Sequence, residues 1–185
     1  MASGKTTLAK RLENKLKAVT FSFENPIPMI EKRKKLNLDM NKEKDFIINQ
    51  RMFIETEIER FQSLPEGKVI FDRGPEDIEF FTLYFPLSIG QNWDVKGQLK
   101  KELQELGDCR SDFIVYLDAS ENTLLNRKQN DHSRKRGSFE KFIQMYPYEK
   151  EWYNQFNTTF IDVDHKTPEE LEDWTLNYLH GIGFI

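Results

Sequence analysis

Hydrophobic and polar residues follow two periods along the chain, one typical of helices and one typical of short buried strands. Leu8, Leu12 and Leu16 recur every four residues, which places their side chains on one face of a helix. Short apolar runs rich in β-branched and aromatic residues indicate strands instead. The pattern predicts helices at residues 6–17, 29–38, 41–64, 75–81, 94–107, 121–129, 138–156 and 167–180. It predicts strands at residues 19–23, 68–72, 112–118 and 158–163.

This alternation of helices and strands, with short connections, predicts an α/β fold with a parallel sheet. The length of 185 residues suits a single domain spanning residues 1–185. A charged fraction of 31% and a hydrophobic fraction of 38% are typical of a soluble globular protein.

Charge, hydropathy and cysteine content limit the classes of partner and the cellular compartment that we expect. The net charge of −4 argues against a general nucleic-acid-binding surface, so we expect no nucleic-acid partner. No apolar run approaches the roughly 20 residues of a membrane span, so we expect no membrane partner. The one cysteine, Cys109, leaves no internal disulfide framework, which favours a reducing, cytoplasmic location.

The start of the chain matches the last part of a phosphate-binding loop. Gly4-Lys5-Thr6 fits the end of the pattern G-x-x-x-x-G-K-[ST], in which backbone N–H groups point at a phosphate chain. Lys5 would reach the β- and γ-phosphates of ATP, and the Thr6 hydroxyl would hold Mg²⁺. An ordinary helix start with a basic first turn is the alternative. The predicted nucleotide-binding residues are Ala2, Ser3, Gly4, Lys5, Thr6 and Thr7.

Two carboxylates stand at the ends of predicted strands. Glu24 directly follows the strand at 19–23, and Asp72 ends the strand at 68–72. Carboxyl ends of parallel strands share one edge of a sheet, where ligands bind. Asp72 would hold Mg²⁺ or its water shell, and the adjacent Arg73 would contact phosphate oxygens as a fork. The alternatives are a turn residue for Glu24 and a surface Asp-Arg pair for the other two.

A glutamine and a basic segment complete the candidate site. Gln50 shares a predicted helix stripe with Phe53, and a glutamine among aromatic residues would read the edge of a flat heterocycle. A boundary glutamine is the alternative. The polar, basic segment 127–137 suggests a mobile lid that closes over the γ-phosphate and excludes water. A solvated loop is the alternative for this segment. The candidate lid arginines are Arg127, Arg134 and Arg136.

Taken together, these landmarks resemble the deoxynucleoside kinase family, within the broader group that includes thymidylate kinases. The resemblance spans about residues 1–156 and depends on the order and spacing of five features. They are the phosphate loop, the Glu-Asn-Pro at Glu24, the glutamine Gln50, the Asp-Arg pair at Asp72, and the strand that leads to the arginine-rich lid. The resemblance implies a P-loop kinase-like parallel sheet flanked by helices.

The resemblance also implies roles for single residues. Glu24 matches the glutamate that acts as base for the sugar 5′-hydroxyl, although Asn25 intervenes before the proline. Asp72-Arg73 matches the family's Glu-Arg pair with a carboxylate one methylene shorter. Thymidylate kinases carry Asp-Arg here, so the choice between a nucleoside and a nucleotide acceptor stays open. No clear counterpart of the family's sugar-binding tyrosine and glutamate is present.

The phosphate-loop pattern is incomplete at its N-terminal side. Its first glycine would lie before Met1, as would the strand that feeds the loop. In the resembled family this first strand is central in the sheet. We therefore expect the first, central strand to be missing from this chain, because of a fragment, an alternative start or a gene model begun too late.

The sequence thus predicts an ATP-dependent small-molecule kinase, a phosphotransferase, with the 5′-hydroxyl of a (deoxy)nucleoside as the favoured acceptor. A nucleoside monophosphate (thymidylate-like) or other small-metabolite kinase is the alternative among enzymes. A catalytically inactive nucleotide-binding regulatory protein is the alternative of another class. A homodimer is compatible with the sequence. The predicted catalytic residues are Glu24, Arg73, Arg127, Arg134 and Arg136, with Gln50 and Phe53 binding substrate.

Overall fold

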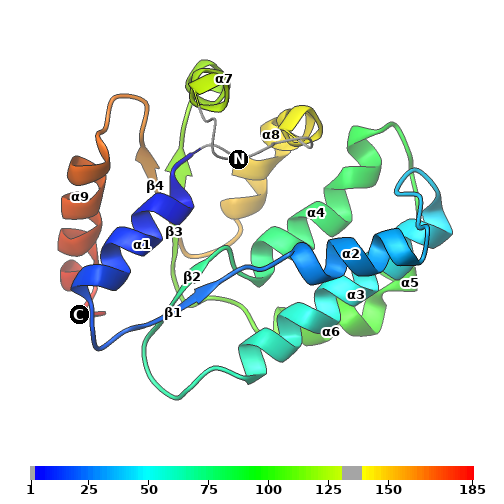
Figure 1. Cartoon of the computed structure of the whole chain (residues 1–185), viewed down its shortest axis with the longest axis horizontal. Coiled ribbons are helices and arrows are strands. Elements are labelled where there is room, and N and C mark those ends of the chain that lie inside the picture. The colour runs from blue at the N-terminus through cyan, green and yellow to red at the C-terminus, as the bar shows by residue number, and fades with distance from the viewer. Residues whose placement is uncertain (1–2, 131–138) are drawn as a thin grey trace. The chain divides into compact units, whose positions relative to one another are not determined.

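The computed structural model describes residues 3–130 and 139–185, and Figure 1 traces the whole chain. Helices and strands alternate along the described part, as the sequence predicts. The strands are β1 (Thr20–Phe23), β2 (Val69–Asp72), β3 (Ile114–Asp118) and β4 (Thr158–Asp162). The helices are α1 (Lys5–Lys15), α2 (Ile27–Lys35), α3 (Glu43–Gln62), α4 (Pro75–Ser88), α5 (Val95–Gln98), α6 (Lys100–Gly107), α7 (Glu121–Asn130), α8 (Phe139–Tyr153) and α9 (Pro168–Gly181).

The strands pair in parallel, two by two. β1 lies beside β2 with Phe23 opposite Asp72, and β3 lies beside β4 with Asp118 opposite Asp162. Parallel neighbours cannot be joined by a tight turn, so the chain makes a long, mainly helical crossover between the strands of each pair. The predicted α/β class with parallel strands flanked by helices is confirmed.

The described residues divide into two compact units. One comprises residues Met1–Phe23, Glu66–Asp72 and Phe113–Ile185, and it contains both strand pairs with α1, α7, α8 and α9. The other comprises Glu24–Pro65 and Arg73–Asp112, and it is built from α2 to α6. The single domain expected from the chain length stays a prediction.

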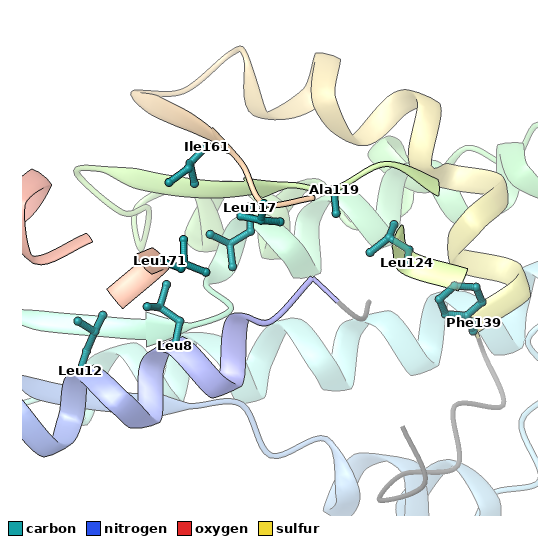
Figure 2. Close-up of a cluster of buried hydrophobic side chains, with 9 residues drawn as sticks. Leu8, Leu12, Leu117, Ala119, Leu124, Phe139, Ile161 and Leu171 are labelled. Atoms are coloured by element: carbon teal, nitrogen blue, oxygen red, sulfur yellow. The ribbon is translucent and has the colours of Figure 1, made fainter. Parts of the chain in front are cut away.

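Leucines of α1 anchor the core of the first unit. Leu8 and Leu12 are buried, and Leu16 is partly buried against the same cluster, as their four-residue spacing predicts. Figure 2 shows Leu8 pointing toward Leu171 of α9, with Leu117 of β3 beside them. The helix that follows the phosphate loop is therefore fixed by the main apolar cluster of this unit.

A buried carboxylate adds a polar clamp between α1 and α9. Glu172 of α9 is 2% exposed and forms ion pairs with Arg11 and Lys15, which lie one turn apart on α1. Hydrogen bonds from these two cations lower the pKa of the Glu172 carboxyl despite its desolvation. The clamp therefore supports the orientation that the leucines impose on α1.

In the second unit, aromatic residues pack between α3 and α4. Phe46 of α3 and Phe85 of α4 are fully buried and stack with ring centroids 5.4 Å apart. α4 begins at Pro75, as the sequence predicts, because proline suits a first helical position where no N–H partner is needed.

One predicted helix is wrong. The single helix expected at 94–107 is two helices, α5 and α6, separated at Leu99, which has φ −117° and ψ 25°. No proline or glycine stands at this position to signal a break. The side chain at the break, Leu99, is fully buried. Among the described residues, no helix combines the length and apolarity needed to cross a bilayer.

The α1 leucines provide a test of the core. We expect Leu12→Ala to lower the free energy of unfolding by about 2–5 kcal/mol, because it removes a side chain that is 2% exposed and leaves a cavity. Leu16→Ala, at the residue that caps the C-terminus of α1, is the matched control, and its partly buried side chain predicts a clearly smaller loss. Chemical denaturation of both variants measures the difference, and equal losses would contradict the assigned core face.

Candidate active site

The phosphate loop leads directly into α1. Gly4 has φ 101° and ψ 3°, a left-handed conformation that only glycine adopts without strain. The helix begins at Lys5, and the Gly4 carbonyl accepts a hydrogen bond from the Leu8 N–H at 3.0 Å. The first N–H groups of a helix have no partner within it, and the helix dipole adds positive potential there. Lys5 and Thr6 thus stand where such a helix start binds phosphate.

Side chains around the loop hold its conformation. Ser3 is buried, and its Oγ accepts a hydrogen bond from Lys5 Nζ at 3.4 Å. Arg127 of α7 donates from Nη1 to the Ser3 carbonyl at 3.2 Å and from Nη2 to the Val163 carbonyl at 2.6 Å. Arg127 therefore ties the loop to the residue after β4, an interaction that sequence reasoning did not anticipate. Thr7 is exposed on the first turn of α1.

The predicted lid is only partly described. Arg127 lies on α7, whereas Arg134 and Arg136 lie outside the described residues, as does Ala2 of the loop. The lid at 127–137 and the catalytic roles of its arginines stay predictions.

Asp72 at the end of β2 suits a cation. The residue is 9% exposed, and its Oδ1 is buried without a hydrogen-bond partner among the described residues. A buried carboxylate oxygen without a donor or cation is costly. α1, which carries Thr6, packs against β2 in the same unit. A hard carboxylate oxygen and a hydroxyl are the ligands that Mg²⁺ prefers together with phosphate oxygens, so these residues fit the predicted ion.

Within the part of the chain that the structure describes, Asp72 does not belong to a larger group of metal-ligating side chains. In residues 3–130 and 139–185, no group of three or more histidine, cysteine, aspartate or glutamate side chains could hold a metal ion by itself. This donor set is typical of a nucleotide site, in which the phosphates supply most of the ligands of the ion.

Glu24 and Arg73 form an ion pair in the second unit. Arg73 Nη1 lies 3.4 Å from Glu24 Oε2, and the two side chains are 32% and 21% exposed. The pairing follows from the strand register, because Glu24 comes after Phe23 and Arg73 comes after Asp72, which is opposite Phe23. Each residue was predicted from the sequence as a site residue, but their contact was not.

The backbone of Arg73 is unusual. Its φ is 69°, in the left-handed region that non-glycine residues seldom occupy. Such a conformation costs roughly 1–2 kcal/mol and persists where the surroundings determine it. Arg60 of α3 donates from Nη2 to the Arg73 carbonyl at 2.7 Å and also pairs with Glu57. Sequence reasoning missed Glu57 and Arg60, although an acidic residue beside the apolar stripe of α3 was a signal.

Gln50 and Phe53 lie on α3, as predicted. Gln50 is 2% exposed, and its Oε1 accepts a hydrogen bond from the Thr82 hydroxyl of α4 at 3.0 Å. Phe53 is half-buried. The amide of Gln50 is thus held between two helices, and reading of a base edge stays a prediction.

The family model described as AAA domain matches residues 2–170, which is most of the chain. The chain belongs to the AAA domain family. Its membership agrees with a nucleotide-binding phosphate loop at residues 4–6. No curated protein matches the chain.

Two solved structures share the fold of this AAA domain. One is deoxyadenosine kinase from M. mycoides with the products dCMP and a flexible dCDP bound, with a TM-score of 0.76 and 18% identity over 98% of this chain and 95% of that one. The other is deoxyadenosine kinase from M. mycoides with bound dCTP, with a TM-score of 0.66 and 18% identity over 96% and 95%. At the level of the fold, the predicted resemblance to deoxynucleoside kinases is confirmed.

The left-handed glycine of the loop gives a direct test. We expect Gly4→Ala to weaken binding of a nucleoside triphosphate and to cost about 1 kcal/mol of stability, because a Cβ is strained at φ 101°. Gly107→Ala at the end of α6 is the control, since that glycine has space for a Cβ and no positive φ. Titration calorimetry and thermal unfolding measure both effects. Unchanged affinity in Gly4→Ala would exclude the loop from the binding site.

Proposed function

We propose that the protein is an ATP-dependent kinase that transfers the γ-phosphoryl group to the 5′-hydroxyl of a (deoxy)nucleoside. The observation that carries the proposal is the Glu24–Arg73 ion pair. Arg73 directly follows Asp72, whose Oδ1 is buried without a hydrogen-bond partner among the described residues. The fold shared with a deoxyadenosine kinase supports it. An acceptor base, a phosphate-contacting arginine and a cation ligand are the parts that phosphoryl transfer requires.

Residues of the first unit bind the donor in this proposal. Lys5 and the N–H groups at the start of α1 hold the donor phosphates, and Arg127 keeps the loop in place through the Ser3 carbonyl. Thr6 and Asp72 would hold Mg²⁺. When bound, Mg²⁺ neutralises charge on the phosphates.

Residues of the second unit act on the acceptor. Glu24 orients the acceptor hydroxyl and accepts its proton, since a carboxylate within hydrogen-bond reach acts as a general base. Arg73 fixes the direction of the Glu24 carboxylate through their contact and stabilises the charge spread over the transferring phosphoryl group. Gln50 and Phe53 of α3 contact the base of the acceptor.

The acceptor class has a second candidate. Asp72-Arg73 carries the shorter carboxylate that thymidylate kinases have at this place, which favours a nucleoside monophosphate as the alternative acceptor. The proposal also includes a cytoplasmic location, suggested by the single cysteine, and it is compatible with a homodimer.

The donor site is tested at Lys5. With Mg-ATP and a panel of nucleosides and nucleoside monophosphates, Lys5→Ala should lower kcat by roughly 100-fold or more, because a cation close to the γ-phosphate is lost. Lys10→Ala removes an exposed lysine from the same helix and should leave the rate unchanged. Absence of phosphorylated product with every acceptor in the wild-type protein would contradict the proposed function.

The acceptor site is tested at Glu24. Glu24→Gln keeps the shape of the side chain but removes its charge, and we expect kcat to fall by roughly 10²–10⁴-fold. Binding of the triphosphate should stay almost unchanged, because Glu24 acts on the acceptor alone. Glu31→Gln on the exposed side of α2 is the control. Product formation and donor affinity are measured on both variants. Full activity of Glu24→Gln would show that Glu24 is a turn residue without a catalytic role.

A further inference from the structure

Two residues of α3 without a role in the proposed chemistry, Glu57 and Arg60, form a pair, and Arg60 contacts the residue that follows β2. Glu57 is 5% exposed, and its carboxylate receives two hydrogen bonds from Arg60, at 2.9 Å from Nε and at 2.5 Å from Nη2. Paired bonds of this kind fix the plane of a guanidinium group. Glu57 thus determines where the Arg60 donors point.

The guanidinium of Arg60 also reaches the backbone beyond α3. Its Nη2 donates to the Arg73 carbonyl at 2.7 Å. Arg73 is the residue with φ 69°, and its own guanidinium meets Glu24 at 3.4 Å. A carbonyl held by a fixed donor restricts rotation of the peptide that follows Arg73. The contact therefore lies next to the strained dihedral angle that sets the direction of the Arg73 side chain.

The cost of burying Glu57 indicates that this arrangement has a role. Desolvation raises the pKa of the Glu57 carboxyl, and the nearby Glu24 and Asp77 raise it further, while Arg60 opposes the shift. A buried ion pair is seldom a net source of stability, since apolar residues of similar volume often serve as well. Its value here is the direction that it gives to Arg60.

We propose that Arg60, oriented by Glu57, is a positioning residue that holds the Arg73 backbone so that the Arg73 guanidinium engages Glu24. The proposal extends the proposed kinase function, in which Arg73 and Glu24 act on the acceptor side. Arg60 acts only through Arg73 and touches no substrate.

The chain contains a matched control for this contact. Arg51, also on α3, pairs with Glu102 at 2.5 Å and donates from Nη2 to the Gln98 carbonyl at 3.3 Å. This arginine has the same set of partners, a carboxylate and a backbone carbonyl, in the same unit. Arg51→Met therefore measures how the loss of an arginine that joins a carboxylate to a backbone carbonyl changes the stability of the fold, without a change at Arg73.

The first experiment does not depend on activity. Trypsin cleaves after arginine, so the rate of cleavage at the Arg73–Gly74 bond reports how firmly that peptide is held. We expect Arg60→Met to accelerate cleavage at this bond several-fold, and Arg51→Met to leave it at the wild-type rate, with products identified by mass spectrometry. Equal cleavage in the two variants would overturn the proposal. Arg60→Lys, which keeps the charge but loses the fork, replaces Arg60→Met if that variant does not fold.

The second experiment uses kinetics. Arg60→Met should lower kcat by roughly 10- to 100-fold, the effect of a small misplacement, with the KM for ATP within about twofold of the wild type. The double variant Arg60→Met/Arg73→Ala should be no slower than Arg73→Ala alone, because Arg60 acts through Arg73. Additive losses, or a kcat equal to that of Arg51→Met, would overturn the proposal. Accelerated cleavage in a protein without kinase activity on any acceptor would contradict the proposed function and leave the anchoring of Arg73 standing.

Discussion

The parallel register of β1 and β2 is the constraint on which the acceptor side of the candidate site depends. Because Phe23 lies opposite Asp72, the next residues along each strand, Glu24 and Arg73, emerge side by side and form an ion pair. A shift of the register by one residue would separate them and turn every side chain of the shifted strand to the other face of the sheet. Four residues in each strand thus bring together parts of the chain that are far apart in the sequence.

Two carboxyl groups, Asp72 at the end of β2 and Glu57 on α3, are costly to bury, so stability alone does not explain them. Asp72 keeps a carboxylate oxygen without a hydrogen-bond partner among the described residues, and Glu57 is ionisable yet almost fully buried. At each of these positions, a buried apolar side chain of similar volume would stabilise the fold more than the carboxyl group does. Backbone strain is stored at the next residue after Asp72, in the φ of Arg73. Buried carboxyl groups and backbone strain often gather at functional sites, and the apolar cluster of Leu8 and Leu12 contains neither.

The fold of this protein is supported by its likeness to solved structures, whereas the proposed function depends on single residues. The fold is shared with a deoxyadenosine kinase at 18% identity, a level at which backbone architecture persists although most side chains differ. A fold of this kind hosts many activities, so the acceptor depends on single site residues, for which Gln50 and Glu24 are the proposed candidates. Gln50 already has a partner in Thr82, so base recognition would use the amide that this bond holds in place.

The sequence by itself determined the helices and strands and the candidate residues at their ends. Leu8 and Leu12 mark a helix because side chains four residues apart share a face, and Asp72 ends an apolar run that reads as a buried strand. Only the tertiary structure decided the break at Leu99, the contact of Arg127 with Ser3, and the chain of contacts from Glu57 through Arg60 to Arg73. These depend on burial and on partners distant in the sequence, which no local period or propensity encodes.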